Sequence, residues 1–365
     1  MTKTFEEITQ NVLTIGPQYK NHRGGIGAVL SIYAKNLKTF KFIASYDGNR
    51  SSLLNFALFI YPILNLVWTL IMDRTIKFVH IHGASNGSFY RKYIMYCISK
   101  YIFSKKVVFH LHGGGFQNFY SNSGKFVRRA VQNILTGSSA VICLSKYWFQ
   151  YLNSNFEISN LFIINNPVDP PQHNENIYRD NPGKTKLLFL GLISKNKGIF
   201  DLIDVLATNK ESFQNRLCLS IGGNGETDKL RKEINDKKLG EMVEYLGWVT
   251  QDKKNNCLQQ TDVYILPSYN EGLPISILEA MSYGKPIIST NVGGIPEIVV
   301  SGRNGLLIEP GNLKQMEEAI NFCIENVDTI KEYGKESRLL VKKHLPDAVM
   351  EELQKVYNEL LSENV

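Results

Sequence analysis

Two glutamates in one segment of the chain have the residue type and the setting for chemistry on an anionic ligand. TDVYILPSYNEGLPISILEAMSYGKPIIST predicts a strand, a turn that holds Glu271 and a helix that carries Glu279. Pro274 lies where this helix would start, because proline at the first helical position loses no hydrogen bond. Backbone amides at Gly272, Leu273 and the helix N-terminus favour an anion, and a carboxylate beside them suits hydroxyl groups or developing positive charge. Without a ligand, the two glutamates would be a turn residue and an ion-paired helix residue.

The position of Glu279 on its predicted helix has a further consequence. Ile275 lies one turn before it and Tyr283 one turn after it, so the carboxylate has apolar neighbours along the helix. Burying a charge without a partner is costly. We therefore expect a polar partner for Glu279.

Glycines and histidines near predicted strand ends are further candidates for ligand contact. Gly24, Gly25 and Gly27 are expected to form a loop after the first strand, where backbone amides can approach a phosphate closely. The segment GGIGAVL is not a dinucleotide fingerprint, since the third glycine of that motif would fall at Leu30. As an alternative to a ligand loop, these glycines would form a plain turn.

Four histidines lie in two successive predicted strands, within the motifs HIHG and HLHG. His82 and His112 are at the strand ends and are site candidates, although a histidine there is often only structural. His80 and His110 precede them and are expected to point to the opposite face of the sheet.

Lys197, the second lysine of GLISKNKG, is a candidate for neutralising a diphosphate. Lys197 precedes Gly198 and a helix predicted from about Ile199, so the motif would hold a fixed cation near a helix start. The chain has no Asp-x-Asp, and no cluster of histidine, cysteine or carboxylate residues has metal-ligand spacing. The expectation is therefore that neither a metal ion nor another cofactor takes part.

The elements that must position these residues alternate between short apolar strands and longer helical stretches, which is typical of a parallel sheet covered by helices on both faces. Ligands of such sheets bind beyond the carboxyl ends of the strands. The predicted strands are 12–16, 40–45, 77–83, 106–113, 140–145 and 161–167 in the first half and 187–191, 217–223, 243–249, 263–268, 285–290 and 305–310 in the second.

A polar stretch from Asn165 to Lys186 contains four prolines and separates the two series of strands. The fold class predicted is α/β, with two doubly wound Rossmann-like domains that face each other across a cleft. The first domain is expected at 1–168 and the second at 184–345. Residues 346–365 have helical periodicity and are expected to pack back on the first domain.

Composition limits the class of protein and its location. With 365 residues, 43% of them hydrophobic and 21% charged, the chain is typical of a packed globular protein with two domains. Five cysteines without a CxxC pair argue against a disulfide framework and a structural zinc site, and favour a reducing compartment. The start, MTKTFEEITQ, lacks the pattern of a signal peptide, so a cytoplasmic location is expected.

Charge differs between the halves of the chain. Residues 1–180 carry 19 Lys and Arg against 8 Asp and Glu, a net charge of +11, and residues 181–365 carry 22 against 26, a net charge of −4. A basic half attracts phosphates of nucleic acid, anionic lipid or a small molecule, although a lysine-rich solvated surface would look the same.

The segment at residues 53–72, LLNFALFIYPILNLVWTLIM, is apolar enough and long enough to span a bilayer. Pro62 interrupts it, and a span would place segments that read as strands of one sheet on opposite sides of the membrane. A buried helix, or one that lies in the membrane interface, is the expectation.

In this context the two glutamates resemble the signature of the retaining family 4 glycosyltransferases of GT-B fold. The motifs GGIG, HLHGGG, GLISKNKG, IGGNGE, YLGWV, PSYNEGLPISILEAMSYG, VGGIPE and NGLLIEPGN occur in the family's order over nearly the whole chain. The resemblance implies transfer of a hexose-like sugar from a nucleoside-diphosphate-sugar to an acceptor hydroxyl, with retention at the anomeric carbon and without a metal ion.

The resemblance also implies roles for single residues. His112 would contact the transferred sugar, Glu271 would face the sugar ring and Lys197 would neutralise the leaving diphosphate, so these three are the catalytic candidates. Donor contacts are implied for Gly25, Gly223, Gly272, Leu273, Pro274 and Glu279, the last through the ribose hydroxyls. Contacts with the acceptor or the sugar are implied for Gly24, Gly27 and His82.

The chain departs from the family at Leu192, where an arginine is common. Either Lys195 or Lys197 then carries the charge alone, or a basic residue of the first domain such as Arg23 reaches across. A nucleotide-sugar-binding protein without transferase activity is therefore one alternative, and a nucleotide-sugar epimerase on a related fold is another. The base, the sugar, the acceptor, the linkage and the oligomeric state stay open.

Basic and aromatic residues alternate in the first domain and indicate where the acceptor binds. The basic ones are Arg91, Lys92, Lys100, Lys105, Lys106, Arg128 and Arg129, and the aromatic ones are Tyr93, Tyr96, Tyr101 and Phe103. This composition suits an anionic membrane surface and a lipid-linked saccharide acceptor. Similar enzymes build bacterial capsule, O-antigen or exopolysaccharide, so a peripheral position on the inner face of the cell membrane is expected. No nucleic-acid motif accompanies the basic residues, and a nucleic-acid partner is not expected.

Overall fold

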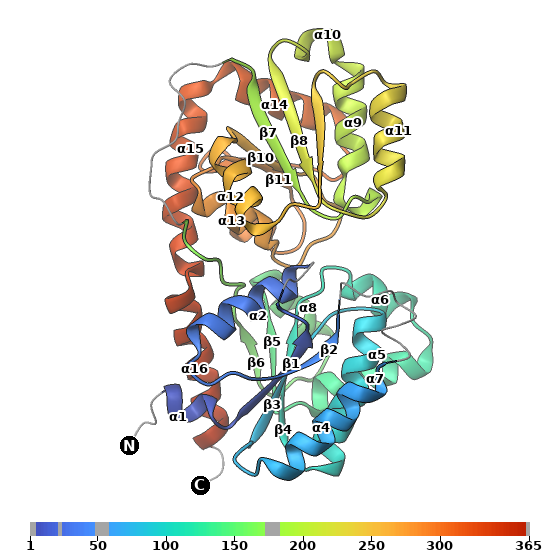
Figure 1. The fold of residues 1–365 in the computed structure, drawn as a ribbon, viewed down its shortest axis with the longest axis vertical. Coiled ribbons are helices and arrows are strands. Elements are labelled where there is room, and N and C mark those ends of the chain that lie inside the picture. The colour runs from blue at the N-terminus through green and yellow to red at the C-terminus, as the bar shows by residue number, and fades with distance from the viewer. Residues whose placement is uncertain (1–4, 21–23, 48–57, 172–182, 363–365) are drawn as a thin grey trace. The chain divides into compact units, whose positions relative to one another are not determined.

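The computed structural model describes residues 5–20, 24–47, 58–171 and 183–362, which divide into two compact units (Figure 1). Unit 1 comprises Met1–Val168 and His344–Val365, and unit 2 comprises Asp169–Lys343. Each unit is a parallel sheet with helices on both faces. The predicted α/β class with two doubly wound sheets is confirmed.

The sheet of unit 1 has the strand order β2-β1-β3-β4-β5-β6. Its strands are β1 (Val12–Pro17), β2 (Lys41–Tyr46), β3 (Phe78–Gly83), β4 (Lys106–Leu111), β5 (Ala140–Cys143) and β6 (Leu161–Ile163). The helices are α1 (Phe5–Thr9), α2 (Gly25–Asn36), α4 (Ile60–Met72), α5 (Gly87–Cys97), η1 (Ile98–Ile102), α6 (Phe116–Asn122), α7 (Lys125–Gly137), α8 (Lys146–Asn155) and α16 (Pro346–Ser362).

The two faces of this sheet differ in chemistry. Alternation along β3 places Val79 and Ile81 on one face, where they belong to an apolar core with residues of α4, α5 and α7 such as Phe89. The same alternation places His80 and His82 on the other face, which α2 and α16 cover (Figure 1). The side with the histidines also holds apolar side chains such as Phe78, whose ring packs on Tyr357. It is called the polar layer below because of its histidines.

The sheet of unit 2 has the strand order β12-β11-β10-β7-β8-β9. Its strands are β7 (Thr185–Leu190), β8 (Leu217–Gly222), β9 (Val243–Gly247), β10 (Val263–Leu266), β11 (Ile287–Thr290) and β12 (Gly305–Ile308). The helices are η2 (Lys195–Lys197), α9 (Ile199–Thr208), α10 (Lys210–Phe213), α11 (Thr227–Asp236), α12 (Gln251–Gln260), α13 (Ile275–Ser282), η3 (Ile295–Glu297), α14 (Leu313–Glu325), α15 (Val327–Leu340) and η4 (Val341–His344).

All twelve predicted strands are present, but several end earlier than predicted. The strand predicted to reach residue 113 ends at Leu111, and the one predicted to reach 167 ends at Ile163. The glycine, histidine and asparagine residues beyond these points leave the ladder and enter loops. The carboxyl ends of the strands, where ligands of such sheets bind, are therefore rich in polar residues.

The apolar segment at 53–72 contains helix α4, and its first five residues lie outside the described part of the chain. Only Leu66 and Leu70 of α4 are buried, so the expectation of a buried helix is wrong. Large apolar side chains on its outer side are each more than half exposed: Ile60, Tyr61, Leu64, Trp68, Ile71 and Met72. Within the described ranges, every helix is too short or too polar to cross a membrane.

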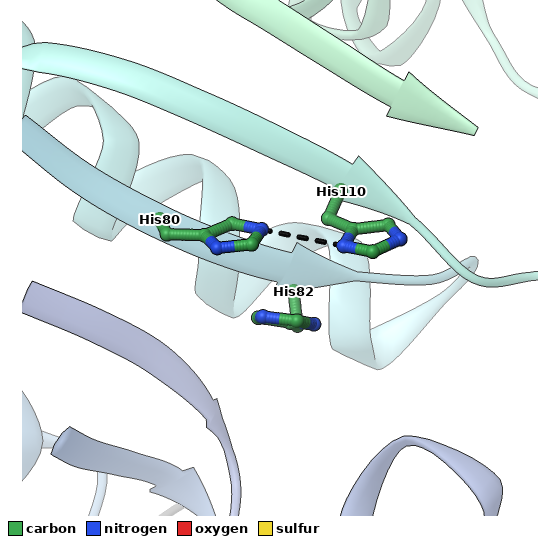
Figure 2. A group of neighbouring side chains, drawn as sticks. All are labelled: His80, His82 and His110. Atoms are coloured by element: carbon green, nitrogen blue, oxygen red, sulfur yellow. Dashed lines mark hydrogen bonds between the residues drawn. The ribbon is translucent and has the colours of Figure 1, made fainter. Parts of the chain in front are cut away.

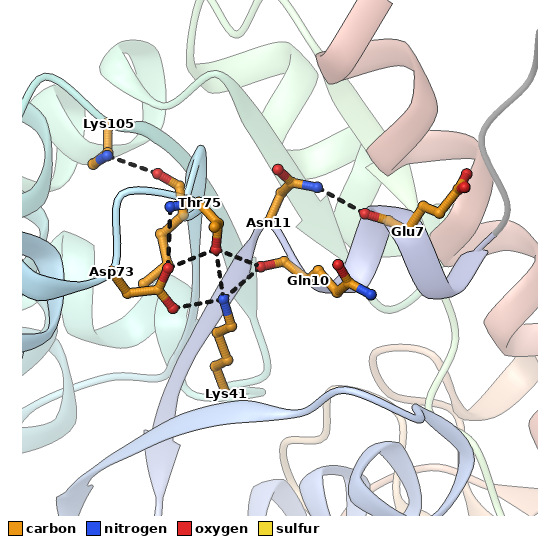
Figure 3. Close-up of polar contacts among 8 residues, drawn as sticks. Glu7, Gln10, Asn11, Lys41, Asp73, Thr75 and Lys105 are labelled. Atoms are coloured by element: carbon orange, nitrogen blue, oxygen red, sulfur yellow. Dashed lines mark hydrogen bonds and ion pairs between the residues drawn. The ribbon is translucent and has the colours of Figure 1, made fainter.

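A charged contact joins the end of α4 to the sheet (Figure 3). The ammonium group of Lys41 lies 2.6 Å from Oδ2 of Asp73 and donates to the carbonyl oxygen of Gln10 and the hydroxyl of Thr75. Three segments distant in sequence are thereby joined, which fixes the exit from α4 next to β1 and β2.

Candidate functional site

The point at which the strand order of unit 2 reverses lies between β7 and β10. Read from β9 the order is 3-2-1-4-5-6, and in such sheets the loops on either side of the reversal form the ligand crevice. Lys197 comes from the loop after β7 and Glu271 from the loop after β10. The topology therefore brings together two of the predicted catalytic residues, although they are far apart in the chain.

Lys197 and Glu271 form an ion pair at this point. Nζ of Lys197 lies 2.5 Å from Oε1 of Glu271, and the hydroxyl of Ser268 donates to the same oxygen over 2.7 Å. Glu271 is buried and Lys197 is about a quarter exposed, whereas Lys195 in the same short helix is exposed. Ser268 lies in the PSYNEG motif, three residues before Glu271, but no role was predicted for its hydroxyl.

Close backbone packing holds these two loops against each other. Gly198 has a φ of +68°, and a Cβ at this position would overlap the carbonyl oxygen of Pro267. The backbone amide of Tyr269 donates to the carbonyl of Asn196, and the side chain of Asn270 donates to that of Asn196. The position of Lys197 relative to Glu271 is thus set by both loops.

Glu279 lies on α13 and has the polar partner that its position required. Its Oε1 is 2.5 Å from Nζ of Lys254 on α12, which confirms the expectation of a partner. Nothing in the sequence pointed to Lys254, because only the packing of the two helices joins these residues. Pro274 is the N-cap of α13, one residue before the helical position that was predicted for it.

Tyr264 on β10 is a further residue of this site. Its hydroxyl donates to the carbonyl oxygen of Leu190 at the end of β7, over 2.9 Å. Burial raises the pKa of Tyr264, and the carboxylates of Glu279 and Glu271 raise it further. Both glutamates therefore lie near the phenol of one buried residue. Tyr264 lies within an apolar strand pattern, so the sequence did not identify it as a site residue.

The predicted glycine contacts of unit 2 lie in tightly packed backbone. Gly223 follows β8 with a φ of +154°, and a Cβ there would overlap the carbonyl oxygen of Gly191. Gly272 and Leu273 are buried, and the carbonyl of Gly272 accepts a hydrogen bond from the amide of Gly294 over 2.8 Å. Leu192, after β7, is about half exposed.

In unit 1 the predicted glycine loop is largely helical, so that expectation is wrong. Gly25 is the first residue of α2 and Gly27 lies in its first turn, and only Gly24 precedes the helix. Gly24 and Gly25 are exposed and Gly27 is buried. The backbone amides of a first helical turn have no partner within the helix. They therefore remain available to bind a phosphate although the predicted loop is absent. Arg23 lies outside the described residues.

The four histidines of β3 and the β4 end lie together, which corrects the expectation that His80 and His110 face the opposite side. Residues two apart on a strand share a face, and the register pairs His82 with His110. Nδ1 of His82 is 2.8 Å from Nε2 of His112, and Nε2 of His80 is 3.3 Å from Nδ1 of His110 (Figure 2). The sequence showed no histidine cluster with metal-ligand spacing, but in the structure one ring nitrogen from each of His80, His82 and His110 lies within 4.8 Å of those of the other two.

These histidines are uncharged at neutral pH. Burial lowers the pKa of His80 to about 3 and those of His82 and His110 well below their ordinary value. Burial also lowers the pKa of His112 to about 3, against a hydrogen bond with Asn166 that raises it. Each ring then offers one N–H and one lone pair, and His112 presents a neutral imidazole to its surroundings.

The basic and aromatic residues expected to meet the acceptor are mostly engaged inside unit 1. Lys92 and Tyr96 are buried. The ammonium groups of Lys100, Lys105 and Lys106 each donate to a backbone carbonyl of the same unit. The expectation that this set forms an open surface is wrong for these residues, because their long side chains bend back to the backbone.

Comparison with known proteins gives the chain its relatives. Residues 172–340 match the family described as "Glycosyl transferases group 1". An uncharacterized glycosyltransferase of Methanocaldococcus jannaschii is 31% identical over 225 residues, which cover 62% of this chain and 61% of that protein. A Klebsiella pneumoniae protein described as an "uncharacterized 41.2 kDa protein in cps region" is 24% identical over 287 residues, covering 73% of this chain and 77% of its own length.

Solved structures extend the likeness to both units. The crystal structure of Anabaena HepE in complex with UDP and glucose superimposes with a TM-score of 0.74 at 18% identity, over 96% of this chain and 99% of that one. Identity this low carries the fold alone. Residues 172–340 therefore resemble group 1 glycosyltransferases, and the chain has the GT-B fold of its structural neighbours.

Proposed function

We propose that the protein is a retaining glycosyltransferase of family 4, which moves a sugar from a nucleoside-diphosphate-sugar to an acceptor hydroxyl without a metal ion. The observation that carries the proposal is the ion pair of Lys197 and Glu271 at the strand-order reversal of unit 2. The group 1 family match over that unit and the UDP bound by Anabaena HepE support a nucleotide-sugar donor.

The proposed reaction needs positive charge on the leaving diphosphate and polar groups around the sugar. Lys197 supplies the charge, while Glu271 faces the sugar ring and Glu279 binds the ribose hydroxyls. The bond from the anomeric carbon to the diphosphate oxygen breaks, and a bond to the acceptor oxygen forms on the same face. The acceptor proton passes to the departing diphosphate oxygen, so no protein nucleophile takes part. His112, as a neutral imidazole, contacts the transferred sugar.

A panel of nucleoside diphosphates and their sugars identifies the donor. A ligand that binds only the folded state raises Tm, so the right base should stand out in a thermal-shift screen. Product analysis with the donor alone and with acceptor then separates three functions. A transferase forms product only with acceptor, an epimerase converts the donor without one, and a binding protein leaves the donor unchanged. Either of the last two results would contradict the proposal.

Two lysines of the same short helix provide a matched pair of variants. Lys197→Met should lower kcat by about 10²-fold or more, because fixed charge at a developing anion contributes on this scale. Lys195→Met removes an exposed charge two residues away and should keep most of the activity. Tm of the Lys195 variant should stay near that of the wild type, whereas Tm of the Lys197 variant should fall, because Glu271 is left buried without its partner. Activities are therefore compared at a temperature well below both Tm values. Loss of activity in the Lys195 variant alone would assign the role of Lys197 to its neighbour.

We also propose that the acceptor is a lipid-linked saccharide at an anionic membrane surface, in the assembly of a bacterial surface polysaccharide. Helix α4 supports this with its exposed apolar side, which includes Leu64 and Trp68. Arg74 and Lys77, which follow α4 in the chain, are exposed and basic, and the only acidic residue in the sequence between Asp47 and Glu157 is Asp73. Apolar side chains next to excess positive charge favour binding in the interface of an anionic bilayer. The K. pneumoniae relative in the cps region is consistent with this role.

Flotation with vesicles tests the membrane proposal. The protein should float with vesicles that contain phosphatidylglycerol and stay behind with phosphatidylcholine alone. Leu64→Asp on α4 should reduce flotation by about tenfold, since burying one leucine is worth roughly 1.5–3 kcal/mol. Leu339→Asp on α15 of unit 2 changes a comparably exposed leucine and should float like the wild type. Equal flotation of the two variants would contradict a role for α4.

A further inference from the structure

The polar layer of unit 1 brings together three histidines, and of these the resemblance implies a contact with the acceptor or the sugar for His82 alone. His80 and His82 come from β3 and His110 from its neighbour β4 (Figure 2). All three are buried, and one ring nitrogen from each lies within 4.8 Å of those of the other two. Such a group on two adjacent strands has little freedom to separate, because the ladder fixes the backbone.

The separations fit ligands of one small cation. Two imidazole nitrogens on a tetrahedral zinc ion, with Zn–N bonds of about 2.0–2.1 Å, lie roughly 3.3 Å apart. Nε2 of His80 and Nδ1 of His110 are 3.3 Å apart, which is long for a hydrogen bond between them. One ring nitrogen of His82 lies within 4.8 Å of a ring nitrogen of each of the other two, so all three rings border the same small volume.

The cluster also has hydrogen-bonding capacity that the described residues do not use. Nε2 of His82 is buried with no hydrogen-bond partner among the described residues, and so is the hydroxyl of Tyr33. The ring of Tyr33 lies 5.6 Å from that of His82. Buried polar atoms without partners are rare and indicate an additional ligand such as an ion or a water molecule.

We propose that His80, His82 and His110 bind one Zn²⁺ ion in the polar layer of unit 1. Imidazole nitrogens are preferred ligands of zinc, and a zinc-bound histidine commonly donates its other N–H to a nearby acceptor. Two of the three rings have such a partner: Nδ1 of His80 is 2.6 Å from the Tyr357 hydroxyl, and Nδ1 of His82 is 2.8 Å from Nε2 of His112. These contacts leave Nε2 of both rings for the ion.

The bound ion would have a structural effect that is independent of sugar transfer. Tyr357 belongs to α16, so an ion held by His80 fixes that helix to β3 through one intervening ring. His82 in turn would hold His112 in a single tautomer. The ion would therefore join α16 to the strand end that carries the predicted sugar contact.

Metal binding by the full-length protein, with any histidine tag removed, tests the proposal. The protein is first dialysed against a chelator and then titrated with Zn²⁺ in competition with a chromophoric chelator. We expect one Zn²⁺ per chain and a rise in Tm. Substitution with Co²⁺ should give the visible bands of a tetrahedral nitrogen site without the near-ultraviolet bands of cobalt–thiolate bonds. Absence of Zn²⁺ binding, or thiolate bands that point to the cysteines, would overturn the proposal.

Variants locate the ion. His80→Gln and His110→Gln should each weaken Zn²⁺ binding by at least about 100-fold. Tyr357→Phe, which keeps the packing of the ring, should weaken it by about 10–100-fold through loss of orientation. His344→Gln changes a buried histidine of unit 1 outside the cluster and should bind as the wild type does. Circular dichroism identifies variants that fold, and undiminished binding in folded His80 and His110 variants would refute the site.

Discussion

In unit 2, each of the two glutamates of the predicted signature has a lysine partner. Glu271 pairs with Lys197 and Glu279 with Lys254, each at 2.5 Å. These pairs are partly buried. Removal of one partner would therefore leave a buried charge uncompensated and destabilise the fold. A diphosphate that recruits Lys197 would have to compensate Glu271 as well, for which the sugar hydroxyls are suitable donors.

Asp73 offers a residue-scale test by pH. The hydrogen bond from Lys41, followed by the one with Thr75, lowers the pKa of Asp73 below its ordinary value. A carboxyl with a lowered pKa stabilises the fold above its unfolded value of about 3.9 and loses this contribution as pH falls through the folded pKa. Asp73→Asn should therefore lower Tm at pH 7 by about 1–3 °C, and the difference from the wild type should shrink towards pH 3.

Calorimetry of both proteins from pH 7 to pH 3 measures this difference. Asp328→Asn, at an exposed position of α15, is a suitable control because its carboxylate lies 3.5 Å from Lys331 and is almost fully exposed. Its Tm should follow the wild type at every pH. A difference for the Asp73 variant that is constant with pH would exclude the charged contact as its cause.

At the scale of elements, the loops after β7 and β10 depend on the left-handed backbone of Gly198. An alanine there would have both an unfavourable φ and an overlap with the Pro267 carbonyl. Gly198→Ala should destabilise unit 2 by at least about 2 kcal/mol, or roughly 4–8 °C in Tm. Gly240→Ala, at an exposed position with open space around it, should leave Tm nearly unchanged. Equal Tm values for the two variants would contradict the packing described here.

The elements themselves were largely predictable from the sequence, and the contacts between them were not. Twelve strands followed from apolar runs that end in polar residues, and Glu279 was predicted to need a partner. Lys254 was missed because no local pattern joins it to Glu279. Ser268 was missed although it lies three residues before Glu271, because it was interpreted only as the end of a strand. The histidine group was missed for a different reason. His80 and His82 were predicted to point to opposite faces of the sheet, whereas residues two apart on a strand point to the same face.

At the scale of the whole molecule, unit 1 is discontinuous in sequence, because it contains residues on both sides of unit 2 in the chain. Buried side chains of α16, among them Leu353 and Tyr357, belong to unit 1. A chain that ends after Lys343 should therefore lose hydrogen-exchange protection in β3 and β4, while β7 and β8 keep theirs. The same protection in β3 and β4 with and without α16 would show that the polar layer forms without this helix.

The discontinuity also sets an order of events on the ribosome. Unit 2 is entirely synthesised before the residues of α16 are added, so the nascent chain carries an early sheet whose histidine-bearing side is covered by α2 alone. Translation must continue through Pro346–Ser362 before that side can close. The part of the protein that is made first is therefore completed last, and during that interval it exposes surface that would promote aggregation.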